Sequence, residues 1–221
     1  MPTEYQVKQI EKLLREYRKT QLARLDKQEQ NEARARMMVD QLITRVLGYD
    51  INQDVTTEQR INEKYADYVI KLGRKQYFVV EAKSIGIEIN HKHLDQARKY
   101  ALDEGIDWII LTNGWSLQLY RVVRKKQIQT VKLFECDFTD LKTIKNSAEN
   151  IVYLSKKSIQ KDELNQYWKK CDTLSNENIA KMIQSQDVIA TLRRQLKRNT
   201  GIYFADEDIS KAVMRILCVG K

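Results

Sequence analysis

The spacing of apolar residues predicts helices near the amino end of the chain. Five apolar residues recur there at helical spacing: Val7, Ile10, Leu13, Leu14 and Tyr17. The surrounding segment, residues 3–30, is otherwise polar, so we expect an exposed or partner-packed helix and treat residues 1–31 as a helical N-terminal arm. A second helix is predicted for residues 32–47, where a wide apolar face ends at Gly48, a natural helix stop.

The pattern changes in the centre to alternating or wholly apolar runs, which are typical of strands. Five strands are predicted, at residues 65–72, 76–85, 108–111, 116–123 and 128–136. The first two are joined by a short turn at 73–75 and should form a hairpin, and the polar segment 50–62 has room for one more short strand. A helix is predicted for about 90–103. This order of elements predicts an α/β fold with a mixed central sheet flanked by helices.

Strand signals stop after about residue 138. Helical patterns follow at 138–154, 161–170, 176–198 and 206–217, with a loop at 199–201 between the last two. We therefore expect a core domain at 32–155 and a helical C-terminal region at 156–221.

Composition narrows the class of protein. Of 221 residues, 42% are apolar, which is enough to bury a core, and Lys and Arg exceed Asp and Glu by 39 to 30, giving a net charge of +9. Such an excess favours a polyanionic partner, although by itself it supports only non-specific attraction. The three cysteines lack metal-site or disulfide spacing. Neither a secretory signal nor a membrane span is recognisable, so we expect a cytoplasmic protein without a membrane partner.

Candidate chemistry appears on the predicted hairpin. Glu81 and Lys83 end a very apolar strand and, two residues apart, should point to the same face. Asp67, on the other strand, lies at a similar distance from the turn, so the two carboxylates should be neighbours. Such a pair repels itself, and a hard divalent cation with oxygen ligands relieves the repulsion. Two alternatives remain. Glu81 and Lys83 could form an ordinary salt bridge at the end of the strand, and the nearby Glu63 could take the place of Asp67 as the first carboxylate.

The order Asp67, thirteen residues, then Glu81-Ala82-Lys83 resembles the PD-(D/E)xK nuclease motif, with Ala66-Asp67 replacing Pro-Asp. Three further features match the N-terminal nuclease domain of type I restriction enzyme R subunits. They are the Gln96-x-x-x-Tyr100 helix motif, the pair of runs Leu111-Thr112-Asn113-Gly114 and Leu117-Gln118-Leu119-Tyr120, and the helix-borne Glu32. Together they cover roughly residues 30–137 in the right order.

The resemblance implies a restriction-endonuclease-like core and a metal-dependent endonuclease, or nuclease subunit, that hydrolyses DNA phosphodiester bonds. It implies that Asp67, Glu81 and the carbonyl of Ala82 bind Mg²⁺ or Mn²⁺, and that Lys83 orients or activates the attacking water. Gln96 and Tyr100 would position the substrate strand, and Glu32 would complete the site. The alternative is a catalytically idle DNA-binding or assembly subunit of the same fold.

Partners follow from what the chain lacks. It has no G-x-x-x-x-G-K-[ST] motif and no room for a helicase motor, so a helicase, specificity or methyltransferase partner would be encoded elsewhere, and a homodimer is a further option. With DNA as substrate, two basic runs become candidates for phosphate contact. They are Arg121, Arg124, Lys125 and Lys126 in one, and Arg193, Arg194, Lys197 and Arg198 in the other.

Overall fold

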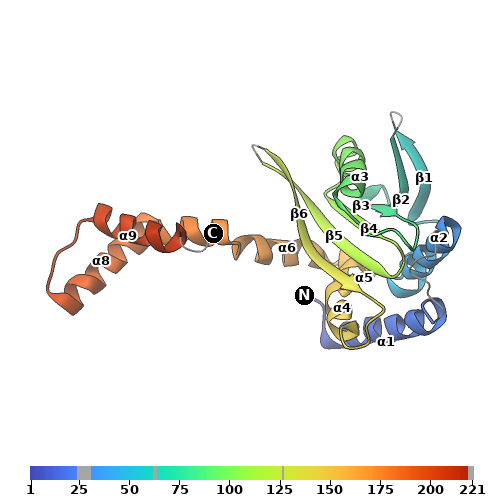
Figure 1. Ribbon diagram of the computed structural model, residues 1–221, viewed down its shortest axis with the longest axis horizontal. Coiled ribbons are helices and arrows are strands. Elements are labelled where there is room, and N and C mark those ends of the chain that lie inside the picture. Colours follow the sequence, from blue (N-terminus) through green and yellow to red (C-terminus); the bar gives the residue numbers. More distant parts are fainter. Residues whose placement is uncertain (24–30, 62–63, 126, 219–221) are drawn as a thin grey trace. The chain divides into compact units, whose positions relative to one another are not determined.

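The computed structural model describes residues 1–23, 31–61, 64–125 and 127–218, and the chain forms two compact units, 1–164 and 165–221. The described part of the first unit contains a six-stranded sheet with the strands in sequence order (Figure 1). The strands are β1 (Val55–Ile61), β2 (Lys64–Leu72), β3 (Lys75–Ala82), β4 (Trp108–Thr112), β5 (Ser116–Arg124) and β6 (Ile128–Asp137). The expected short strand in segment 50–62 is therefore present as β1.

Helices surround the sheet and make up the second unit. In the first unit they are α1 (Glu4–Gln21), α2 (Glu32–Gln41), the π-helix η1 (Leu42–Val46), α3 (His91–Asp103), α4 (Ile144–Ile151), the 3₁₀-helix η2 (Val152–Leu154) and α5 (Lys156–Gln160). Helix α6 (Glu163–Thr173) spans the division between the units, and α7 (Asn176–Ile183), α8 (Gln186–Thr200) and α9 (Asp206–Cys218) follow. None of the described helices is long and apolar enough to cross a membrane.

Three expected helices have different limits in the structure. The N-terminal helix ends at Gln21, and residues 24–30 of the expected segment lie outside the described residues. The pattern at 138–154 becomes helical only at Ile144. The pattern at 176–198 is two helices, because Ser185 leaves the helical region with φ −66° and ψ 149° and starts α8. The prediction of one unbroken helix is therefore wrong. The apolar periodicity continues across Ser185, so it does not reveal that a second helix begins there.

One pair of strands makes the sheet mixed. β3 and β4 are parallel, with Glu81 beside Leu111, and all other neighbouring strands are antiparallel. A parallel pair needs a crossover, and α3 supplies it. The helix packs over β2 to β5 through a buried cluster that includes Val69, Val79, Ala97 and Tyr100. The predicted α/β fold with a mixed sheet is confirmed.

Helix α1 packs against α4 and η1. Three residues of its predicted apolar stripe, Ile10, Leu14 and Tyr17, are buried. The Tyr17 hydroxyl donates to the carbonyl oxygen of Gly114, in the turn between β4 and β5, at 2.6 Å. The helix is thus a packed part of the first unit.

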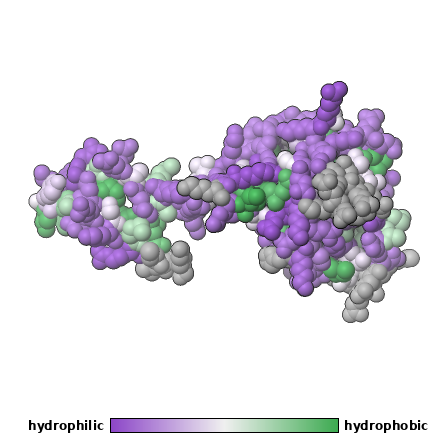
Figure 2. Space-filling view, turned by 90° about the horizontal axis from the view of Figure 1, so that it is seen from above, coloured by the Kyte–Doolittle hydropathy of each residue, from purple (hydrophilic) through white to green (hydrophobic). Residues whose placement is uncertain are grey.

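The second unit has a small core. It contains the buried residues Ile189, Ile209 and Val213, with Leu192 and Phe204 partly buried against them. Figure 2 shows that the visible surface of the first unit is largely hydrophilic, in keeping with the 31% of charged residues.

Candidate functional site

The β2–β3 hairpin sets the positions of the two candidate carboxylates. Its strands are joined at Gly73-Arg74, where Gly73 has a φ of +60°, which suits a two-residue hairpin turn. Next to the turn Lys71 pairs with Gln76, but further along Ile70 pairs with Phe78, so Tyr77 is an extra residue on β3. Such a β-bulge shifts the register by one position.

The bulge decides which way the carboxylates face. The ladder pairs Tyr68 with Val80. Its continuation by one residue places Asp67 opposite Glu81, in keeping with the hydrogen bond from the Ala82 N–H to Asp67. Opposed residues share a face of the sheet, so the two side chains point the same way. If the register of the turn continued without the bulge, Asp67 would stand opposite Val80 and Glu81 would point to the other face.

The face that they share is the one covered by α3. Val69 and Val79, which belong to the buried cluster under this helix, lie two residues from Asp67 and Glu81 respectively, and side chains two apart in a strand point the same way. The carboxylates therefore lie at the end of the strands, beyond the apolar cluster.

The Asp67 carboxylate is anchored at both oxygens. Oδ2 accepts a hydrogen bond from the backbone N–H of Ala82 at 2.8 Å, and Oδ1 receives Nη2 of Arg36 at 3.3 Å. Its side chain is 18% exposed. The carboxylate is thus held against the end of β3 and remains in reach of solvent.

The Glu81 carboxylate is almost completely buried, at 1% exposure. Oε1 lies 2.5 Å from Nζ of Lys83, while Oε2 has no hydrogen-bond partner among the described residues. Burial raises the pKa of Glu81 to about 7; the hydrogen bond from Lys83 opposes the rise, and the negative charge of Asp67 adds to it. A buried carboxylate with one unsatisfied oxygen is costly unless another group serves it.

Glu32 joins the site through an arginine. It lies in the first turn of α2, is largely exposed, and has Oε1 3.3 Å from Nη2 of Arg36, four residues later on the same helix. The same Nη2 contacts Asp67, so Arg36 links the helix carboxylate to the strand carboxylate. The sequence showed Arg36 only as a neighbour of Glu32; its i,i+4 spacing was the available signal, but nothing in the sequence tied it to Asp67.

The start of α3 lies close to Lys83. Burial lowers the pKa of His93, in the first turn, and the positive charge of Lys83 lowers it further. Later on α3, Gln96 is exposed whereas Tyr100 is fully buried, with its hydroxyl lacking a hydrogen-bond partner among the described residues. The role of Gln96 and Tyr100 in positioning a substrate strand stays a prediction.

The donor set suits a hard cation, within limits. The two carboxylates are neighbours, and Oε2 of Glu81 is buried without a hydrogen-bond partner. Mg²⁺ prefers oxygen ligands of this kind, and a bound cation would satisfy that oxygen. Among the described residues no group of three His, Cys, Asp or Glu side chains could hold a metal, so backbone oxygen and water would have to complete the shell. The carbonyl of Ala82 as a third ligand stays a prediction, and Glu63, the alternative carboxylate, lies outside the described residues.

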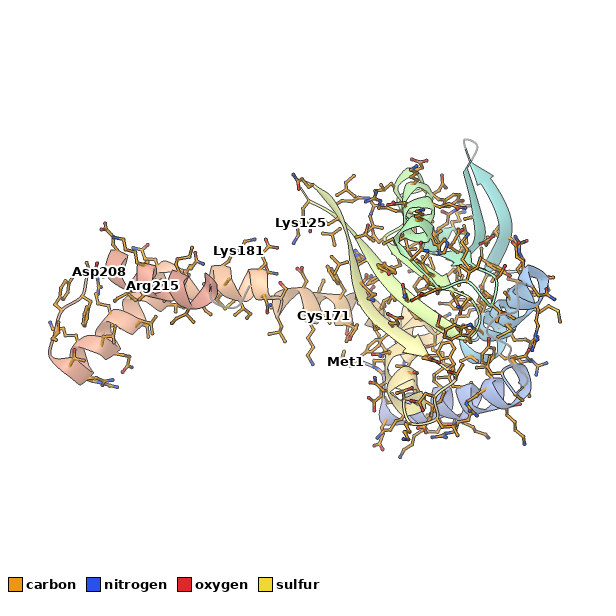
Figure 3. All side chains as sticks on the ribbon, in the orientation of Figure 1. Met1, Lys125, Cys171, Lys181, Asp208 and Arg215 are labelled. Atoms are coloured by element: carbon orange, nitrogen blue, oxygen red, sulfur yellow. The ribbon has the colours of Figure 1, made fainter. Side chains whose placement is uncertain are left out.

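The first basic run is largely engaged within the fold. Arg121 pairs with Asp107 at 2.8 Å and lies over the ring of Trp108 at 4.6 Å, and Arg124 also pairs with Asp107. Lys125 follows at the end of β5, where Figure 3 shows it near the tip of the β5–β6 hairpin. Lys126 lies outside the described residues.

The second basic run lies on α8. Arg193 pairs with Asp206 at 3.0 Å. Arg194 and Arg198 instead donate to neutral side chains of their own helix, Thr191 at 3.1 Å and Gln195 at 2.6 Å. The two arginines and their partners Thr191 and Gln195 line a shallow hollow on α8. Lys197 is exposed.

Comparison with known families bears on the first unit. Residues 31–135 match the family described as type I restriction enzyme R protein N terminus (HSDR_N). This part of the chain is similar to that family. The HSDR_N segment begins at the residue that caps α2 and ends on β6, so it contains Glu32, Asp67, Glu81 and Lys83. Searches of curated proteins and of solved structures each found no match.

Proposed function

We propose that the HSDR_N segment is a metal-dependent endonuclease, or the nuclease subunit of a larger enzyme, that hydrolyses DNA phosphodiester bonds. The observation that carries the proposal is the placement of Asp67, Glu81 and Lys83 at one end of one sheet face, with a buried, unsatisfied oxygen on Glu81. The similarity to the type I restriction enzyme R protein N terminus supports a nuclease-type domain of a restriction system. The motif type, PD-(D/E)xK, is part of the proposal.

Asp67 and Glu81 would hold the cation, Mg²⁺ or Mn²⁺. When bound, a divalent cation there polarises the scissile phosphate and offsets the charge that develops on it. Asp67 keeps its carboxylate fixed through the Ala82 N–H, so the ligand is positioned before a cation arrives. Glu81 keeps one oxygen on Lys83 and has the other available for a ligand role.

Lys83 would act on the nucleophile. Its ammonium group is held against Glu81 at 2.5 Å and its side chain is 22% exposed, so it meets solvent at the edge of the site. An ammonium in that place orients an attacking water and stabilises negative charge on the phosphate during attack. Glu32 would contribute through Arg36 rather than by direct contact with Asp67.

The proposed setting is DNA restriction or defence, or a mobile element, in the cytoplasm. A helicase, specificity or methyltransferase partner would supply functions for which the described fold has no element, and a second copy of the chain would supply a second site. Helices outside the HSDR_N segment, α1 and α6 to α9, are the candidates for partner contact.

The test is cleavage of supercoiled, linear and single-stranded DNA with Mg²⁺ or Mn²⁺. We expect metal-dependent cutting by the wild type and a loss of roughly 100-fold or more in Glu81→Gln and Lys83→Ala. The matched control is Glu88→Gln, which removes an exposed carboxylate seven residues along and should cut like the wild type.

Two results would contradict the proposal. Equal residual cutting by all proteins would indicate a contaminating nuclease. No cutting together with salt-sensitive DNA binding would favour the alternative function, a catalytically idle DNA-binding or assembly subunit, because binding through phosphates needs no intact metal site.

A further inference from the structure

Two adjoining hollows lie along α1 in the first unit. One, of about 530 Å³, is lined by α1, α2 and η1, and the other, of about 400 Å³, is lined by α1, η1, η2 and α5. Leu13, Arg45 and Val46 line both, so the two hollows form one groove, the α1 groove. Its lining extends along α1 from Tyr5 to Gln21, a length of about 24 Å at 1.5 Å per residue. A helical segment of about four turns has the same length.

Large apolar side chains lie exposed at both ends of the α1 groove. Tyr5 is 71% exposed in one hollow, and Met37 is 66% exposed in the other. Between them lie the buried Ile10 and Val46 and the half-buried Leu13. Tyr and Met are enriched in protein interfaces, and a helix bound in a groove is anchored by apolar side chains spaced along its length. The shape and the apolar lining therefore suit a helical partner.

The charge of the α1 groove is positive. The described residues that line it include three cations, Arg45, Lys156 and Lys157, and one acidic residue, Glu16. Lys156 is paired with Asp54 at 2.6 Å. Arg45 and Lys157 are both exposed, and neither forms an ion pair within the part of the chain that the structure describes. Two unmatched cations beside an apolar floor favour an occupant that brings carboxylates.

We propose that the α1 groove binds an amphipathic helix of a partner protein, with an apolar stripe that is bordered by acidic residues. Apolar side chains at helical spacing fill the groove between Tyr5 and Met37, and Asp or Glu side chains beside them meet Arg45 and Lys157. The complementary charge fixes the direction of the bound helix and disfavours helices with basic borders. None of the residues assigned to the candidate nuclease site lines the groove, so docking and DNA cleavage can be tested separately.

Two other occupants match the α1 groove less well. A nucleic acid would contact the cations through its phosphates but would leave Tyr5, Met37 and the apolar floor without apolar contacts. A second copy of the chain carries a net charge of +9, so it would on average add positive charge beside Arg45 and Lys157. An acidic, apolar helix satisfies both properties of the groove.

The experiment selects ligands for the full chain from a displayed library of random peptides of about 16 residues, the number that spans the groove as a helix. Fluorescence anisotropy then measures the affinity of individual selected peptides. We expect the enriched peptides to have apolar residues at helical spacing with Asp or Glu at their borders. Changing Arg45→Glu and Lys157→Glu together should weaken their binding at least about tenfold, because each reversal turns an attraction into a repulsion.

A second variant tests the apolar ends of the groove. Changing Tyr5→Ala and Met37→Ala together should weaken peptide binding by about tenfold, since truncated apolar anchors lose buried contact area. Both side chains are exposed, so the fold should tolerate the change. Thermal melting of each variant confirms that a loss of binding is not a loss of folding.

The matched control is Lys12→Glu combined with Lys19→Glu. It makes the same change in net charge on α1, at two exposed lysines that do not line the α1 groove, and should leave peptide affinity near that of the wild type. An equal loss of affinity in this control and in the Arg45→Glu, Lys157→Glu variant would overturn the proposal, because the effect would then come from net charge alone.

Three further results would overturn the proposal. The first is a selection that enriches no peptide, or only peptides without acidic residues. The second is a loss of DNA affinity in the Arg45→Glu, Lys157→Glu variant that exceeds the loss in the lysine control, which would assign the groove to nucleic acid. The third is a loss of self-association in the same variant, measured by analytical ultracentrifugation, which would assign the groove to a second copy of the chain.

Discussion

The hydroxyl of Tyr17 on α1 donates a hydrogen bond of 2.6 Å to the carbonyl oxygen of Gly114, 97 residues along the chain. The same hydroxyl lies 3.2 Å from the carbonyl oxygen of Met38 on α2. One buried group therefore connects the N-terminal helix, α2 and the turn that follows β4. Gly114 has a φ of +86°, and a Cβ there would lie 2.9 Å from Met38, so this contact leaves no space for a side chain.

We expect Tyr17→Phe to lower the free energy of unfolding by about 1–2 kcal/mol, because the carbonyl oxygen of Gly114 loses a buried donor. Urea unfolding followed by circular dichroism measures the change. Tyr5→Phe is the control, since Tyr5 is 71% exposed on the same helix and should be neutral. Equal stability of both variants would show that α1 is not fixed by this contact.

Stability should depend on pH through Glu81. The folded, metal-free protein holds a proton on Glu81 up to a pKa of about 7, whereas the ordinary value is 4.5. Between these values the folded state binds more protons, so the free energy of unfolding falls as pH rises from about 4.5 through about 7. The fall should be at most about 3 kcal/mol.

Glu81→Gln should lose this part of the pH dependence and be the more stable protein at pH 8. Denaturation in buffers containing a chelator, from pH 5 to pH 8, makes the comparison, with Glu88→Gln as the exposed counterpart. Identical slopes for the wild type and Glu81→Gln would contradict the assignment of a raised pKa to Glu81.

Deleting the bulge residue tests the register of the hairpin. Because Tyr77 is the extra residue between the pairs Lys71–Gln76 and Ile70–Phe78, its deletion should leave Asp67 opposite Glu81. We expect a folded variant that is destabilised by about 0.5–3 kcal/mol and that keeps metal-dependent cleavage. Deleting Val79 instead should turn Glu81 to the other face and remove cleavage; equal behaviour of the two deletions would contradict this register.

The two basic runs should differ in their effects on DNA binding. Arg121 and Arg124 are bound to Asp107 within the fold, so changing both to Gln should mainly lower thermal stability. Arg194 and Arg198 donate to neutral groups, so both charges are available for phosphates. Changing both to Gln should lower the slope of log affinity against log salt concentration by about 2, one for each lost phosphate contact. Fluorescence anisotropy at several salt concentrations measures this slope; a larger change in the slope from the first pair than from the second would reverse the assignment.

Cysteine reactivity should separate a buried thiol from an exposed one. Burial raises the pKa of Cys136 to about 12, whereas Cys171 is exposed on α6 (Figure 3). Because the thiolate is the reactive form, iodoacetamide at pH 8 should modify Cys171 well before Cys136 in the native protein. Peptide mass spectrometry follows both sites, and in denaturant both should react; early modification of native Cys136 would contradict its burial.

Local patterns in the sequence predicted the core of the fold well. The helix at 32–47, the hairpin, the helix before β4 and the last three strands are all confirmed, because each has a clear apolar period and a clear turn or cap. The carboxylate pair could be anticipated from its distance to the turn. The reason that the pair faces one way, the bulge at Tyr77, could not be read from the sequence, since no residue type there marks a bulge.

Contacts between residues far apart in the chain could not be predicted from the sequence. Nothing near Arg36 indicates that its side chain reaches a strand 31 residues later, and nothing near Arg121 shows that Asp107 is its partner. Likewise, the first unit continues to Leu164 and includes the buried Ile159. The end of the strand signals and the helical patterns after it had suggested a boundary near residue 155. Tertiary packing decides these points, and apolar periodicity does not report it.

The mixed sheet has a consequence for the order of folding. The β2–β3 hairpin joins residues that are close in sequence, and hairpins form within about 1–10 μs. The parallel β3–β4 pair requires residues 83–107, with α3 among them, to cross over first, which is slower because a longer loop must close. Asp67 and Glu81 should therefore meet in an early hairpin, before the apolar cluster under α3 is complete, so their mutual repulsion acts on the folding chain as well as on the finished protein.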